Sequence, residues 1–120
     1  MSVGVSEFRK LALSLPDTVE ASHFELASFR AKGKIFSTLS EKEQRAMVKL
    51  TPEQQEMMVG AEPKLFQRIP NAWGDKGATW MHLKNADRSA VLSALTTAWN
   101  NVAVKPTRPR SKALGGKRRA

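Results

Sequence analysis

The 120-residue chain contains no cysteine, so neither disulfide bonds nor thiolate chemistry contributes to its stability or activity. No apolar run approaches the ~20 residues that a membrane-spanning helix needs. Residues 1–6 have no basic stretch ahead of an apolar one, so we expect no signal peptide. These absences predict a cytoplasmic protein without a membrane-spanning segment.

Histidine is also scarce, with two residues in the chain. The only plausible nitrogen and oxygen set for a metal is His23, Glu25 and His82, and their spacing fixes no site. The chain lacks a Gly-x-Ser-x-Gly motif, and a strand pattern rather than a helix follows Gly74 and Gly77, unlike a P-loop. We therefore expect a non-enzymatic protein with no metal and no cofactor.

The net charge of +9 is unevenly spread along the chain. Residues 1–104 hold 13 Lys and Arg against all 11 Asp and Glu, and sum to +2. The remaining segment, 105–120, has seven cations, no acid, two prolines and almost nothing apolar, so we predict a disordered basic tail after one domain, 1–104. The tail cations are Lys105, Arg108, Arg110, Lys112, Lys117, Arg118 and Arg119.

Residues 29–39 show the pattern of a β-hairpin. Apolar and polar residues alternate on both sides of Lys32 and Gly33, and glycine supplies the positive φ of a tight turn. On the second strand we expect Ile35, Ser37 and Leu39 to face away from Phe36 and Thr38.

The other expected elements combine helical and strand periods. Ser6 is the expected cap of a helix that ends before Pro16, and residues 17–22 are expected to form a polar connection. Thr51, Pro52 and Gln54 begin a second helix that we expect to end near Gly60. The remaining expected elements are strands at 45–50, 64–69 and 79–84, a loop at 70–77, and a helix at 88–103 capped by Asp87.

This order predicts an α+β fold, a two-layer sandwich whose antiparallel sheet is covered on one face by the N- and C-terminal helices. We expect a monomer. Four segments and a dipeptide also carry a family resemblance: Phe8–Pro16, Ser28–Phe36, Val48–Gln55, Ala72–Thr79, and Ala98-Trp99 followed by Pro106.

Through these segments the chain resembles the MmcQ/YjbR family, whose fold is similar to that of the CyaY/frataxin group. The resemblance covers about residues 5–106. It implies an α/β sandwich with a "double wing" arrangement and a proposed role in binding DNA. The basic tail lies outside the shared pattern, so the resemblance implies nothing about it.

Basic and aromatic residues of the domain form the candidate nucleic-acid site. We expect Arg30, Lys32 and Lys34 at the hairpin tip, and Trp73 with Lys76 in the loop at 70–77. Trp80, His82 and Lys84 are expected on one strand face, where aromatic rings among cations could stack bases and hold phosphates. With the tail, these residues predict electrostatic, largely sequence-nonspecific binding of nucleic acid, and the family resemblance favours DNA.

Two other interpretations remain open at this point. Trp73 or Trp80 could fill a secondary core under lysine side chains, with the tail only a solubilising segment. Alternatively, a pocket near Trp73, Trp80 and His82 could bind a protein or a small ligand.

Overall fold

The computed structural model describes residues 3–23 and 26–103. Its elements are, in chain order, α1 (Val5–Leu13), β1 (Thr18–His23), β2 (Leu26–Ala31), β3 (Lys34–Ser40), β4 (Arg45–Lys49), α2 (Pro52–Ala61), β5 (Phe66–Arg68), α3 (Ala72–Asp75), β6 (Ala78–His82), the 3-10 turn η1 (Leu83–Asn85) and α4 (Arg88–Ala103). The predicted tail and the approach to the hairpin at Phe24 and Glu25 lie outside the described residues.

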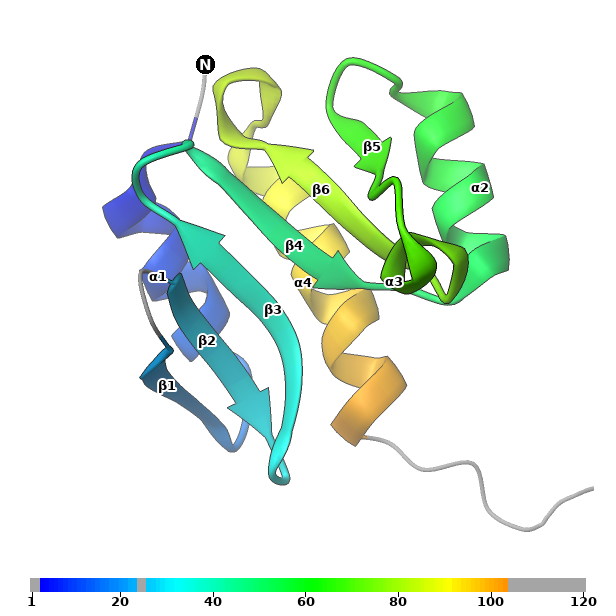
Figure 1. The fold of residues 1–120 in the computed structure, drawn as a ribbon. Coiled ribbons are helices and arrows are strands. Elements are labelled where there is room, and N and C mark those ends of the chain that lie inside the picture. The colour runs from blue at the N-terminus through cyan, green and yellow to red at the C-terminus, as the bar shows by residue number, and fades with distance from the viewer. Residues whose placement is uncertain (1–2, 24–25, 104–120) are drawn as a thin grey trace, which may run out of the picture.

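The strands form one antiparallel sheet in the order β1-β2-β3-β4-β6-β5. Figure 1 looks onto one face of this sheet, with α1 and α4 passing behind the strands. Helix α2 lies beside β5 and shares with α4 a hollow that contains Phe66, so it is on the same side. The α+β sandwich with one covered face is therefore confirmed, and α2 extends the helical layer.

Helix α4 supplies the centre of the core because its apolar stripe crosses the middle strands. Val91, Leu95 and Ala98 are fully buried, as are Phe36 and Leu39 of β3 in the same core cluster. Asp87 caps the helix as predicted, since its Oδ1 accepts from the backbone nitrogen of Ala90 at 2.7 Å. The packing of the apolar stripe of α4 on the middle strands places the helical layer against one face of the sheet.

The hairpin is confirmed, and its turn explains the choice of residues. Lys32 has φ 53° and Gly33 has φ 80°, so both turn residues are left-handed, as in a type I′ turn. The predicted alternation on β3 is wrong at one position. The register shifts next to Phe29 and Arg30, and Phe36 is buried as fully as the adjacent Ser37.

The N-terminal third differs from the sequence prediction in two respects. Residues 18–22 of the expected polar connection, together with His23, form the edge strand β1, which pairs with β2 over its whole length. Helix α1 begins at Val5 with Gly4 as its N-cap and no side-chain cap, so Ser6 is not the capping residue. Backbone pairing to a strong neighbouring strand outweighs the weak hydrophobic pattern of this segment.

Three boundaries farther along the chain also differ. Helix α2 continues through Gly60 to Ala61, and the described positive-φ glycines are Gly33 and Gly77, so Gly60 is not a left-handed stop. The expected loop at 70–77 contains the short helix α3. Strand β6 ends at His82, and the next three residues turn as η1.

Helix α2 begins and is anchored through two adjacent glutamines. Thr51 and Gln54 form the predicted capping box, with hydrogen bonds of 3.1 and 2.9 Å. The buried Gln55 Nε2 donates to the backbone oxygens of Gly74 and Ala78 at 3.0 Å, and reaches Thr79 Oγ1 at 3.1 Å. This one side chain joins α2 to α3 and to the start of β6.

We expect Gln55→Ala to lower the free energy of unfolding by about 1–3 kcal/mol, because it leaves buried acceptors without their donor. Chemical denaturation measures the change. Glu56→Ala, on the exposed side of the same helix, is the matched control and should change stability by less than about 0.5 kcal/mol. Equal losses in the two variants would contradict the anchoring role of Gln55.

Candidate nucleic-acid interface

The uncovered face of the sheet carries one continuous row of side chains across all six strands. Residues paired in antiparallel strands lie on the same side of the sheet. The pairings join Ala21 to Ser28, Thr38, Met47, Trp80 and finally Gln67, from β1 to β5. The same pairing places further residues on this side, in three shorter rows across the strands. These rows are Val19, Arg30 and Ile35; Ser40, Arg45 and His82; and Lys49 with Ala78. We call these residues the open face.

Four open-face side chains form a cluster where β4, β6 and β5 meet. The Arg45 guanidinium carbon lies 3.8 Å from the centroid of the Trp80 ring, which is a cation–π contact. His82 Nε2 and Gln67 Oε1 are 3.0 Å apart. We call Arg45, Gln67, Trp80 and His82 the quartet. It brings an aromatic plane, a cation and two hydrogen-bonding groups into one patch.

The open face is free of negative charge in the part of the chain that the structure describes. None of its residues is Asp or Glu, whereas Arg30, Arg45 and Lys49 are cationic. The acid on β1, Glu20, pairs with Phe29 on the helix side and accepts from Arg9 Nε at 2.9 Å. The described residues of this face therefore carry a net positive charge.

Arg9 forms ion pairs with two carboxylates, Glu20 and Glu41. Its Nη2 donates to Glu41 at 2.9 Å while its Nε is bonded to Glu20. These bonds raise the pKa of Arg9, that to Glu41 more than that to Glu20. The ion pairs join α1 to β1 and to the turn between β3 and β4.

Arg30 extends the positive surface toward the hairpin end. The Arg30 side chain is half-buried on the open face. Its cross-strand partners are Val19 of β1 and Ile35 of β3. Its buried Nε has no hydrogen-bond partner among the described residues. Val19 is 60% exposed, so the cation lies beside apolar surface that solvent reaches.

The structure brings together only part of the predicted site. Trp80 and His82 share the open face as expected, but Lys84 lies in η1, after the strand has ended. Lys34 pairs with the buried Ala31, so it leans to the helix side while Arg30 lies on the open face, and Lys32 is in the turn between them. The predicted tail residues Lys105, Arg108, Arg110, Lys112, Lys117, Arg118 and Arg119 lie outside the described residues.

Trp73 and Lys76 form a separate, firmly held group. Trp73 is 71% exposed although its helix is tightly anchored. Asn71 Oδ1 accepts from the backbone nitrogens of Trp73 and Gly74 at 2.9 and 3.2 Å. A Cβ on Gly74 would lie 1.5 Å from the carbonyl oxygen of Ile69, so only glycine allows this approach.

Four open-face residues, Arg45, Met47, Lys49 and Gln67, were missed as site candidates. Arg45 and Met47 alternate with the buried Ala46 and Val48, so the same period that predicts the strand also places them on the opposite side. Gln67 offers no such signal, because β5 is only three residues long. Its place in the quartet follows from pairing with Trp80.

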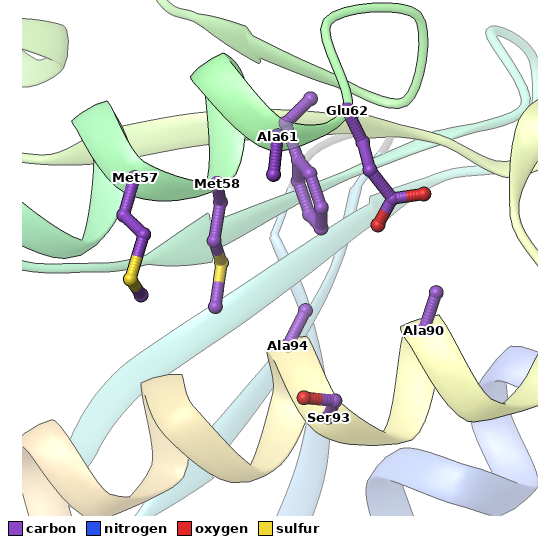
Figure 2. A pocket seen from close by; sticks show the side chains of 8 residues that line it. Met57, Met58, Ala61, Glu62, Ala90, Ser93 and Ala94 are labelled. Atoms are coloured by element: carbon purple, nitrogen blue, oxygen red, sulfur yellow. The ribbon is translucent and has the colours of Figure 1, made fainter.

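Two surface hollows lie elsewhere. One, of about 270 Å³, lies between α2 and α4, where Met57 and Met58 point toward Ala94 and Glu62 is the only charged lining residue (Figure 2). The other, of about 480 Å³, lies beside α1 and includes Glu7 and Arg88. Neither includes Trp73, Trp80 or His82. The acid in the first hollow disfavours a phosphate there.

Within residues 3–23 and 26–103, no three His, Asp or Glu side chains gather as a metal site would require. Over the same ranges, no helix has the length and apolar character to cross a membrane.

Comparison with known protein families identifies the domain. The model of the YjbR family matches residues 13–101, which is most of the chain. The chain belongs to the YjbR family. The match includes every strand and three of the helices of the YjbR domain described above, and the resemblance inferred from the sequence is thereby confirmed.

The YjbR fold is also found in a solved structure. The crystal structure of Deinococcus radiodurans protein DR2400, a DUF419 domain, superposes with a TM-score of 0.67 at 17% sequence identity. The alignment covers 80% of this chain and 75% of that one, and at this identity it speaks for the fold alone. No curated protein matches the chain.

We expect Arg45→Met to destabilise the YjbR domain by about 1 kcal/mol, because the cation–π contact with Trp80 is lost while the aliphatic bulk is kept. Denaturant unfolding followed by circular dichroism measures the change. Lys49→Met, four residues along the same strand and exposed, is the matched control and should have little effect. A similar loss for both variants would mean that the Arg45–Trp80 contact adds no stability.

Proposed function

We propose that the protein is a non-enzymatic, electrostatic and largely sequence-nonspecific DNA-binding protein. The observation that carries the proposal is the open face: a six-stranded sheet surface with an aromatic ring, three Arg and Lys residues and no acid. The resemblance to the MmcQ/YjbR family, with its implied DNA role, agrees with this use of the surface. Binding of this kind needs no cofactor.

Phosphate attraction supplies the affinity in this proposal. Arg30, Arg45 and Lys49 lie along one side of the sheet, where each can neutralise a phosphate and release a counterion. Arginine is well suited to this role because its planar guanidinium matches the oxygens of a phosphate. Lys32, in the hairpin turn, adds charge at the end of the same surface, whereas Lys34 lies on the helix side.

The C-terminal segment adds a second, larger source of charge. Its seven cations exceed the charge of the rest of the chain, +2, and no acid opposes them. Contact of all seven with duplex phosphates would give a slope of about −6 in log affinity against log salt concentration. We include in the proposal that the protein acts as a monomer in the cytoplasm.

The test measures binding of duplex DNA over a series of salt concentrations. Arg30→Ala/Arg45→Ala/Lys49→Ala should weaken binding and reduce the slope by about 2–3, at roughly 0.9 per lost phosphate contact. Deletion of residues 105–120 should reduce it further, by up to about 6. Fluorescence anisotropy of a labelled duplex is the measurement.

The control removes the same charge elsewhere. Lys10→Ala/Lys42→Ala/Lys64→Ala changes three exposed lysines in α1 and two turns, and should leave the slope unchanged. If this control weakens binding as much as the open-face variant does, the open face has no special role. If the full chain does not bind DNA at low salt, the proposed function is wrong.

A further inference from the structure

The quartet combines the groups that recognise a single nucleobase. Gln67 pairs with Trp80, and Arg45 pairs with His82, so the four side chains occupy adjacent positions on three neighbouring strands. We infer that the quartet takes one unpaired base, and that the open face therefore prefers single-stranded nucleic acid to duplex. This inference rests on the proposed function and names its ligand class.

The indole of Trp80 provides the stacking surface. The ring is half-buried, and the Arg45 guanidinium covers it at 3.8 Å. A planar base has the same kind of attraction to the ring face and can replace the guanidinium there. Arg45 is then free to bind the phosphate attached to that base. In the absence of nucleic acid Arg45 covers the indole, and when nucleic acid is bound Arg45 holds the phosphate.

Gln67 and His82 lie at the edge of this stacking surface. They bond to each other through Gln67 Oε1 and His82 Nε2 at 3.0 Å. The Gln67 amide nitrogen and the other ring nitrogen of His82 have no hydrogen bond among the described residues. Both can bond to the edge of a base that lies over Trp80, as amide and imidazole groups do.

The shape of the open face decides between a single strand and a duplex. Bases in a duplex are stacked and paired, so their ring faces are hidden, and their remaining edges are reached only from the grooves. Trp80 is half-buried in β6 with β4 and β5 on either side, so it cannot enter a groove. A duplex can therefore meet this face through its phosphates only, whereas an unpaired base can lie on the ring.

The test compares a short labelled oligothymidine with a duplex of the same length, at one salt concentration, using the full chain. Trp80→Leu should weaken binding of the oligothymidine about 10-fold or more, the usual effect of losing one stacked base, and weaken duplex binding much less. Gln67→Leu, at an exposed position of the edge strand, should weaken the oligothymidine several-fold and spare the duplex. Trp73→Leu removes an indole outside the quartet and should change neither.

Tryptophan fluorescence gives a second readout of the same event. In the Trp73→Leu variant, oligothymidine should quench the emission of Trp80, and added Trp80→Leu should remove that quenching. An oligouridine of equal length tests whether the unpaired base comes from DNA or RNA. Circular dichroism checks that each variant is folded, and Gln67→Leu carries the test if Trp80→Leu is not.

The outcomes separate the two proposals. No binding of either nucleic acid by the full chain would overturn the proposed function, and this inference with it. Equal binding of both, or equal effects of Trp80→Leu and Gln67→Leu on both, would overturn the preference for single strands and leave electrostatic DNA binding standing. Loss of oligothymidine binding alone, with loss of quenching, would establish the base site.

Discussion

The contact between α4 and the middle of the sheet determines which face of the sheet is buried and which face is left to solvent. Val91, Leu95 and Ala98 bury one side of β2, β3 and β4, and α1 and α2 complete that layer on either side of α4 (Figure 1). All the helices long enough to cover a sheet in the described residues are thereby committed to one face. The other face is exposed to solvent, so packing in the core does not constrain the side chains on it.

The distribution of charge follows from this division. Glu20 points to the helix side and is bonded to Arg9, Glu41 is bonded to the same guanidinium, and Asp75 is paired with Arg68 beside α3. The near-neutral total of residues 1–104 therefore hides a surface with cations and no acids. A net charge taken over the domain describes neither face, because the open face carries three cations and no acid, whereas the ion pairs of Arg9 and Arg68 lie away from it.

Local patterns predicted most of the fold. The turn at Lys32 and Gly33, the capping box at Thr51 and the cap at Asp87 each depend on residues within four positions, and each is confirmed. Strand β1 was missed because its order comes from pairing with β2 and not from its own hydrophobic pattern. For the candidate site, Trp80 and His82 followed from alternation, whereas Gln67 joins them through strand pairing that no local pattern encodes.

The position of the end of α4 bears on how the open face and the C-terminal cations would act together in the proposed function. Asn101 Nδ2 donates to the Lys49 carbonyl oxygen at 2.9 Å and to Gln54 Oε1 at 2.8 Å, which fixes the last turn of the helix at the end of β4. The described end of α4 is therefore held beside Lys49, the last cation of the open face. In the proposed function, nucleic acid bound at Lys49 and nucleic acid bound by the cations that follow in the sequence, from Lys105 on, would reinforce each other through effective concentration.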